Sequence, residues 1–300
     1  MKTDVTILTE AQYVNPEKVD WYVQQILSED RILQTALEER GMQVRRKAWD
    51  DKNMDWTQTK CAIFRATWDY FHRFEEFSKW LETASQETML INPPSTIQWN
   101  IDKHYLLDLE EKGIPIVPSE ICKQGDSRSL QEWCDSLGGE KWVLKPTISG
   151  AARHTYLIDR DNVKQHEKIF SDLIEKEDMM LQPFMEHILT EGEVSLMVMN
   201  GKYTHAIKKI AKEGDFRVQD DFGGSVHKYS PSKEEVLFAE RAIAACDPMP
   251  LYGRVDMLRD NTGQWVLGEL ELIEPELWFR EHPAAADPLA NGIHRILSEG

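Results

Sequence analysis

The chain has 300 residues, of which 41% are hydrophobic and 29% are charged, and its formal net charge is −17 at pH 7. This composition is that of a globular protein with two domains, each with room for a sizeable core. No apolar run approaches the roughly 20 residues that cross a bilayer, so we expect no membrane partner. The negative charge argues against nucleic acid as the main partner, and an anionic ligand would need lysines and arginines that converge locally.

The first residues and the cysteines indicate the compartment. Met1-Lys2-Thr3-Asp4 leads directly into a strand-like segment, without the apolar core of a signal peptide. The four cysteines are scattered, and they show neither zinc-site spacing nor a disulfide framework. We therefore expect the protein in a reducing cytoplasm.

Residues 1–95 alternate between strand-like and helix-like segments, which predicts a small parallel α/β domain. The expected strands are Thr3–Thr9, Met42–Trp49, Cys61–Ala66 and Thr88–Ile91, and the expected helices are Val19–Arg40 and Phe71–Thr83. The run Asn92-Pro93-Pro94-Ser95 continues neither kind of element. We place the boundary of the amino-terminal domain after residue 95.

Residues 96–300 predict an α+β region with antiparallel sheet, since no doubly wound repeat is visible. The expected helices are Ile101–Lys112, Leu130–Leu137, Asp161–Glu177, Lys233–Cys246 and Ala286–Ser298. The expected strands are Ile114–Pro118, Trp142–Pro146, Thr155–Ile158, Met179–Phe184, Val194–Met199 and Lys202–Ala211, followed by a closing hairpin.

The closing hairpin carries a set of carboxylates. Two extended segments flank Asp260-Asn261-Thr262-Gly263, a strong turn signal. If the loop is even, the alternation of side chains places Asp256, Glu269 and Glu271 on one face. Such carboxylates repel one another unless a cation lies between them, and oxygen ligands of this kind suit Mg²⁺. An odd loop would break the cluster, and the alternative is a solvated acidic face.

Positive charge converges near the middle of the chain. Lys103 opens the helix after the boundary, and Lys145 lies in the apolar strand Trp142–Pro146, where a lysine is costly to bury without an anion. The alternative for Lys145 is an edge strand that faces water, which Pro146 favours. The small, polar loop Thr147–Thr155 is of a kind that can close over phosphates.

A second basic segment is Tyr203–Arg217, in which period two puts Lys208 and Lys212 on one face. No Gly-x-x-x-x-Gly-Lys-Ser/Thr loop and no Gly-x-Gly-x-x-Gly motif occur in the sequence. A Gly-x-Ser-x-Gly elbow is also absent. A serine nucleophile and a dinucleotide dehydrogenase therefore have no support.

A substrate pocket is expected between the two domains. Arg65 and Asp69 follow the Cys61–Phe64 strand, at the end of the strand where α/β sheets place ligands. Arg65 could pair with a carboxylate and Asp69 could hold an ammonium. Ordinary packing at a strand end is the alternative. Arg280, beyond the hairpin, could help to close the pocket.

Taken in order, these segments resemble the ATP-grasp superfamily from about Asn92 to Asn291. The resemblance is to the glutathione synthetase-like ligases, with the D-cycloserine ligase subgroup as one alternative. It implies an ATP-grasp region over residues 96–300, with a small lid subdomain at about 115–184. Relatives are often dimers, and a homodimer is one alternative for the oligomeric state.

The resemblance also implies roles for individual residues. Lys103 and Lys145 would contact the nucleotide, the segment Met180–Met185 would pair with adenine, and Glu193 would hold the ribose. The implied ATP-binding set is Lys103, Lys145, Ser149, Gly150, Gln182, Phe184, Met185 and Glu193. The implied metal ligands are Asp256, Glu269 and Glu271, and the residues implied to stabilise the transferring phosphate are Arg217, Arg153 and Lys208.

Three positions depart from the family pattern. Gln219 replaces the usual Asn of the arginine loop, and Glu271 stands where an Asn is usual among the metal ligands. The loop that would cover the phosphates has one glycine, Gly150, where relatives often have several. This loop is where a relative that has lost turnover but still binds nucleotide is expected to differ.

The implied activity is an ATP- and Mg²⁺-dependent ligase that joins a small, amino-acid-like carboxylate to a nitrogen nucleophile through an acyl phosphate. The first alternative is a nucleotide-binding module that has lost ligation. The second is a metal-dependent hydrolase, for which the candidate bases are His154, His205 and His227, none of them at metal-motif spacing.

Overall fold

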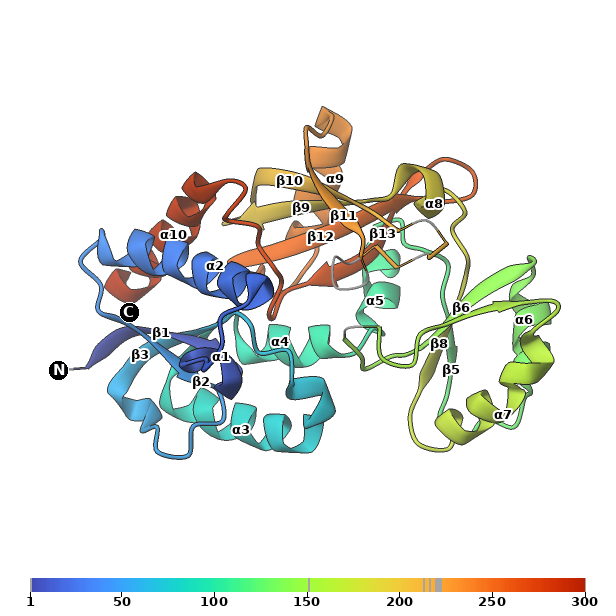
Figure 1. Ribbon diagram of the computed structural model, residues 1–300, viewed down its shortest axis with the longest axis horizontal. Coiled ribbons are helices and arrows are strands. Elements are labelled where there is room, and N and C mark those ends of the chain that lie inside the picture. Colours follow the sequence, from blue (N-terminus) through green and yellow to red (C-terminus); the bar gives the residue numbers. More distant parts are fainter. Residues whose placement is uncertain (1, 151, 213, 216, 219–222, 300) are drawn as a thin grey trace.

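The computed structural model describes the whole chain except residues 1, 151, 213, 216, 219–222 and 300 (Figure 1). Its strands form three sheets, of four, five and four strands. Both termini lie at the end of the molecule opposite the β5-β8-β6-β7 sheet. None of the described helices combines the length and the apolar character needed to cross a membrane.

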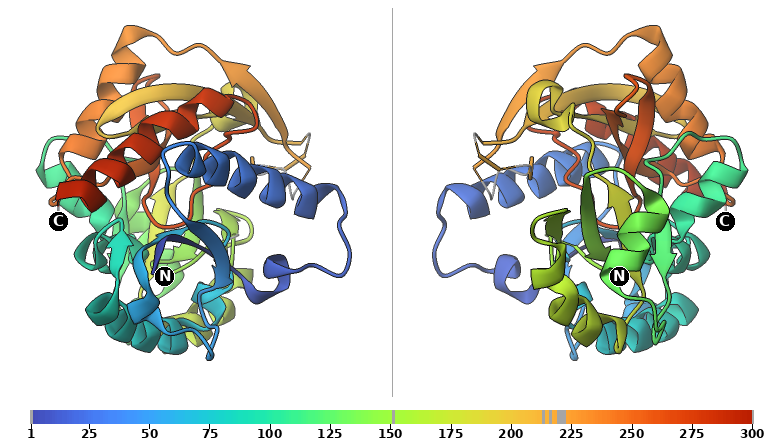
Figure 2. Two further views of the ribbon diagram at one scale, coloured as in Figure 1. Left: turned by 90° about the vertical axis from the view of Figure 1, so that its left-hand side faces the viewer. Right: turned by 90° about the vertical axis from the view of Figure 1, so that its right-hand side faces the viewer.

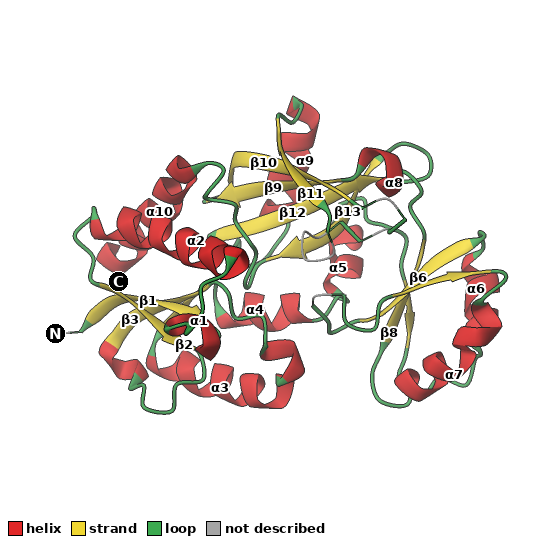
Figure 3. Ribbon diagram, in the orientation of Figure 1, coloured by secondary structure: helices red, strands yellow, loops and turns green. Residues whose placement is uncertain are grey.

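The first sheet is parallel and has the order β2-β1-β3-β4. It comprises β1 (Thr3–Thr9), β2 (Val44–Ala48), β3 (Thr59–Phe64) and β4 (Met89–Ile91), with α1 (Ala11–Val14), α2 (Trp21–Glu38) and α3 (Phe74–Glu87) between them. Alternate residues of the strands face α2 and α3, which lie on opposite sides of the sheet (Figure 3). The predicted α/β amino-terminal domain is confirmed.

The second sheet is antiparallel and has the order β11-β10-β9-β12-β13. It comprises β9 (Glu193–Met199), β10 (Lys202–Ile210), β11 (Ser225–Tyr229), β12 (Tyr252–Arg259) and β13 (Trp265–Glu271), with α8 (Ile188–Glu191) and α9 (Lys233–Ala244). Helix α10 (Ala286–Glu299) returns to pack against α2 (Figure 2). The core of this sheet is therefore continuous with that of the first sheet.

The third sheet is antiparallel and has the order β5-β8-β6-β7. It comprises β5 (Glu120–Cys122), β6 (Lys141–Pro146), β7 (Tyr156–Asp159) and β8 (Met179–Pro183), with α6 (Leu130–Leu137) and α7 (Val163–Ile174) packed on it. The two antiparallel sheets confirm the prediction of an α+β region after the amino-terminal domain.

The segment around Lys103 differs from the prediction. Two helices, α4 (Pro94–Ile101) and α5 (Tyr105–Glu111), replace the single expected helix, and α4 begins within the proline-containing boundary segment. The chain breaks between them because the Lys103 amide donates a hydrogen bond to the Thr147 carbonyl (2.9 Å) and so leaves the helical ladder. At this break the Lys103 side chain reaches the Ser149 carbonyl, in the loop after β6, and Glu269 on β13.

The expected strand Ile114–Pro118 is wrong. Only an isolated bridge between Ile116 and Leu267 forms there, and the strand lies later, at β5. Apolar residues of this segment are buried by packing against β13 rather than by pairing within a ladder.

The hairpin register also differs from the prediction. Arg259 pairs with Trp265, so five residues separate the strands and the loop is odd. A bulge at Gly268 corrects the offset, because it brings Asp256 opposite Glu269. A Cβ at residue 268 would lie 2.6 Å from Leu258 Cδ2, so glycine is what allows this close approach. The three carboxylates are gathered after all, by a route that differs from the predicted one.

Asn92 joins β4 to the second sheet. Its side chain is fully buried and donates to the carbonyls of Tyr252 (2.9 Å) and Leu272 (2.8 Å), while its Oδ1 accepts from the Leu251 amide (2.6 Å). The residue thus fixes the strand ends beside the hairpin.

We expect Asn92→Ala to lower the free energy of unfolding by about 3 kcal/mol, because it leaves buried backbone groups without partners. Urea unfolding measures the effect. Asn53→Ala, at an exposed turn residue, is the control and should change stability by less than about 0.5 kcal/mol. A loss as small at Asn92 would contradict the bridging role.

Candidate functional site

A cavity of about 370 Å³ lies where the three sheets meet, a volume that suits a small organic ligand. Its walls come from the amino-terminal domain, from the third sheet with the loop after β6, and from β9, β10, β12 and β13. Residues that are far apart in the sequence thus line one cavity.

Three carboxylates form the floor of the cavity. Asp256 lies on β12, and Glu269 and Glu271 lie on β13. Each offers an oxygen, and these oxygens lie within 4.8 Å of one another. Asp256 is 1% exposed, so its charge needs compensation by neighbouring groups.

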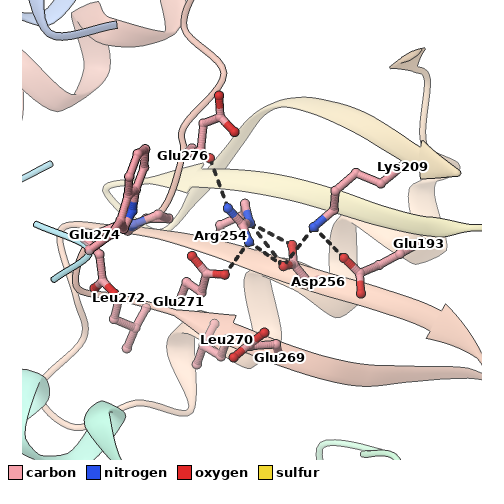
Figure 4. A network of polar contacts seen from close by, with 12 residues as sticks. Glu193, Lys209, Arg254, Asp256, Glu269, Leu270, Glu271, Leu272, Glu274 and Glu276 are labelled. Carbon is pink, nitrogen blue, oxygen red and sulfur yellow. Dashed lines mark hydrogen bonds and ion pairs between the residues drawn. The ribbon is translucent and has the colours of Figure 1, made fainter. Parts of the chain in front are cut away.

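Two cations that the sequence interpretation did not select provide this compensation. Arg254 donates to both oxygens of Asp256 (2.8–2.9 Å) and also pairs with Glu271 (Figure 4). Lys209 Nζ lies 3.3 Å from Asp256 Oδ2 and 2.5 Å from Glu193 Oε1. The floor is thus an alternating network of buried acids and bases.

Two lysines are added to the cavity wall, Lys103 from the break between α4 and α5 and Lys145 from the third sheet. Lys103 Nζ lies 3.2 Å from Glu269 Oε1 and donates to the Ser149 carbonyl (2.8 Å). Lys145 lines the cavity from β6, which is flanked by β8 and β7 and is therefore not an edge strand. The water-facing alternative for Lys145 is wrong. Burial lowers its pKa to about 8, against an opposing effect of Glu269.

The ionisation of the acids follows from these neighbours. Burial raises the pKa of Glu271 to about 8, although Arg254 opposes the shift. Burial acts on Asp256 in the same direction, but Arg254 and Lys209 outweigh it and hold its pKa below the usual range. A further acid, Glu274, has its pKa raised by burial to about 7.

All eight residues of the implied nucleotide-binding set line this cavity. They are Lys103, Lys145, Ser149, Gly150, Gln182, Phe184, Met185 and Glu193. The Phe184 amide donates to the Lys141 carbonyl (2.9 Å), so this N–H is engaged within the protein and the side chain is the part of Phe184 available to a ligand. Glu193 is engaged by Lys209, which ties the implied ribose contact to the floor of the cavity.

The residues implied to stabilise the moving phosphate are brought together only in part. Arg217 lines the cavity, and its side chain pairs with Asp215 (2.7 Å). Arg153 instead pairs with Glu177 (2.6 Å) and is absent from the cavity wall. Lys208 lies on the opposite face of β10, near the Tyr229 ring. The next residue, Lys209, lines the cavity, because successive side chains of a strand point to opposite faces. Lys212 lies beyond the end of β10.

The three residues expected to bind substrate have protein partners instead. Arg65 is 4% exposed and donates to the Pro275 carbonyl (3.0 Å). Asp69 accepts from Trp49 Nε1 (2.8 Å) and from Arg73, and Arg280 lies between Glu29 and Glu276. None of the three lines the cavity. The aromatic and acidic side chains that do so at this end are Tyr22, Trp68, Tyr70, Glu274, Glu276 and Trp278.

One expectation concerns residues that the structure does not describe, and another concerns histidines that lie away from the cavity. Gln219, with Asp220, Asp221 and Phe222 of the arginine loop, lies outside the described residues, as does Ala151 of the loop after β6. The histidines proposed for a hydrolase, His154, His205 and His227, do not line the cavity. His205 is buried and donates to the Leu277 carbonyl (2.9 Å).

Comparison with known proteins identifies two matching families. Residues 115–272 match the family described as RimK-like ATP-grasp domain. Residues 5–92 match the family described as D-cycloserine synthetase DcsG, N-terminal domain.

Individual relatives agree with these families. The chain is 30% identical over 248 residues to the cycloserine biosynthesis protein DcsG of Streptomyces lavendulae, covering 76% of this chain and 80% of that protein. The crystal structure of D-cycloserine synthetase DcsG matches with a TM-score of 0.85 and 26% identity, over 98% of this chain and 99% of the other. The D-alanine–D-alanine ligase of Bacillus anthracis complexed with ATP shares the fold, with a TM-score of 0.65 and 15% identity over 99% of each chain.

The ATP-grasp match covers more than half of the chain, and the resemblance seen in the sequence is confirmed. The chain belongs to the ATP-grasp family, with a RimK-like ATP-grasp domain preceded by a DcsG-type amino-terminal domain.

Proposed function

We propose that the protein is an ATP- and Mg²⁺-dependent ligase that joins a carboxylate to a nitrogen nucleophile. The observation that carries this proposal is the single cavity in which three carboxylates face Lys103, Lys145, Lys209 and Arg254. A hydrolase has no histidine base at this cavity among the described residues. The ligase names of the relatives support the same choice.

The donor set fits a magnesium ion. All three candidate ligands are carboxylates, which Mg²⁺ prefers, and their oxygens converge. Asp256, Glu269 and Glu271 would hold the ion, and Arg254 and Lys209 compensate the remaining charge of the carboxylates. When bound there, Mg²⁺ would neutralise phosphate charge.

The proposed reaction has two steps. A substrate carboxylate oxygen attacks the γ-phosphorus of ATP, ADP leaves, and an acyl phosphate forms. A nitrogen nucleophile then attacks the acyl carbon, phosphate leaves, and the nitrogen loses a proton. Lys103 and Lys145 would bind the phosphates, and Arg217 and Arg254 would stabilise charge as it moves. The loop after β6 would exclude water from the acyl phosphate.

The division of the chain is proposed on the same grounds. We place an amino-terminal domain at residues 1–95 and the ATP-grasp region at 96–300, with a lid at about 115–184. The family matches at 5–92 and 115–272 support this division. The proposed acid is small and amino-acid-like. The cavity end away from the lid is lined by aromatic and acidic side chains, and the acidic ones could bind the ammonium of an amino acid.

A hydroxamate assay tests the proposal. Purified protein with Mg-ATP and hydroxylamine is screened against L- and D-amino acids, and ADP release and hydroxamate are both measured. The expected result is equal release of ADP and hydroxamate with at least one acid. Mg-ATP binding without ADP release for any acid would favour the nucleotide-binding module instead.

Lys145→Ala should weaken Mg-ATP binding at least about tenfold, because a buried cation that compensates phosphate charge is lost. Isothermal titration calorimetry measures the dissociation constant. Lys164→Ala removes an exposed lysine of α7 and should leave it unchanged. Equal affinity in both variants would remove Lys145 from the nucleotide site.

Glu269→Gln should lower turnover at least about 100-fold while the thermal midpoint stays close to that of the parent, since the side chain keeps its size but loses a metal-binding charge. Glu82→Gln, at an exposed residue of α3, is the matched control. Parent-like turnover of Glu269→Gln would exclude it as a ligand.

A further inference from the structure

The segment after β13 is held in an unusual way. Residues 273–280, here called the strap, form neither helix nor strand. Five successive carbonyl oxygens of the strap each accept a hydrogen bond from a different side chain. The pairs are Ile273 with Tyr252 Oη (2.5 Å), Glu274 with Trp68 Nε1 (3.1 Å), Pro275 with Arg65 Nη1 (3.0 Å), Glu276 with Arg254 Nη1 (3.4 Å) and Leu277 with His205 Nε2 (2.9 Å).

The amino-terminal domain supplies anchors at two places in the strap, Pro275 and the end at Phe279 and Arg280. Glu29, on α2, accepts hydrogen bonds from the amides of Phe279 (3.0 Å) and Arg280 (2.9 Å). Arg65, at the end of β3, binds Pro275 and lies 3.7 Å from Glu29. Both charged side chains are at least nine-tenths buried, and neither lines the cavity.

The strap forms one wall of the cavity. Ile273, Glu274, Glu276 and Trp278 all line it. Trp278 has a φ of +52°, a conformation that a bulky side chain adopts only when its surroundings hold it there. The anchors therefore determine where the wall stands.

This wall belongs to the organic substrate rather than to the nucleotide. The triphosphate requires cations such as Lys103, Lys145 and Lys209, whereas the strap offers Glu274, Glu276 and the ring of Trp278, groups that suit the ammonium of an amino acid rather than a phosphate. Arg254 is held chiefly by Asp256 and Glu271, so a shift of the strap leaves it in place.

We infer that Glu29 and Arg65 are positioning residues, through which the amino-terminal domain sets the substrate wall of the ATP-grasp cavity. The inference rests on the proposed ligase function. Loss of either anchor loosens the strap, which weakens binding of the acid but changes neither the nucleotide site nor the metal carboxylates. Arg65 acts through the Pro275 carbonyl and Glu29 acts through the two amides.

The test compares Glu29→Ala, Glu29→Gln and Arg65→Gln with the parent protein. Arg46→Gln is the matched control, because Arg46 and Arg65 both face Asp30, but Arg46 donates to the Tyr13 carbonyl whereas Arg65 donates to the strap. The probes are the Mg²⁺ complex of a non-hydrolysable ATP analogue and the amino acid that gives most ADP release in the hydroxamate screen. Hydrogen exchange is followed in the peptide that covers residues 275–283.

We expect exchange in this peptide to be at least tenfold faster in Glu29→Ala and Arg65→Gln, with the control unchanged. KM for the acid should rise at least tenfold, kcat should change less than threefold, and the analogue should bind within twofold of the parent. Glu29→Gln keeps one acceptor oxygen, so its KM for the acid should rise less than that of Glu29→Ala.

Several outcomes would overturn the inference. Unchanged exchange in both anchor variants would show that the strap does not depend on them, and faster exchange with an unchanged KM would show that the strap does not bind the acid. A KM effect of equal size in the control would assign the change to general destabilisation. If the parent binds the analogue but releases no ADP with any acid, the ligase proposal fails, and the exchange result alone then decides whether Glu29 and Arg65 hold the wall.

Discussion

The site depends on keeping several negative charges together in a poorly solvated space. Asp256 alone would be costly at 1% exposure, and Glu269 and Glu271 add to the repulsion. Arg254 and Lys209 make the arrangement stable because each lies between two acids. The network places its groups in advance, so the proposed binding of a phosphate would need little reorganisation.

The fold and most residues of the site could be predicted from the sequence, whereas the geometry of the site could not. Alternation and helix periodicity were enough for the parallel amino-terminal sheet, for the antiparallel strands and for helices such as α2 and α9. The order of the motifs led to the family, and the cavity gathers the expected nucleotide-binding residues. These features depend on local patterns, which a single sequence records.

The misses share a physical origin in long-range contacts. The break at Lys103 follows from its bond to Thr147, and the register of the hairpin follows from the bulge at Gly268. The strand expected at Lys202–Ala211 agrees with β10 (Lys202–Ile210), but alternation alone does not say which face meets the cavity, so Lys208 was chosen where Lys209 faces it. Arg65 has the chemistry of a carboxylate ligand, but a backbone carbonyl 210 residues away takes its guanidinium.

The turn of the closing hairpin has one more consequence. The amide side chain of Asn261 accepts from the Glu186 N–H (2.9 Å) and donates to the Phe184 carbonyl (2.9 Å), so the tip of the β12–β13 hairpin is fastened to the chain just beyond β8. These two hydrogen bonds connect the strands that carry the acids to the segment beside the proposed adenine position. An opening of the cavity would therefore have to bend the chain elsewhere or break these two hydrogen bonds.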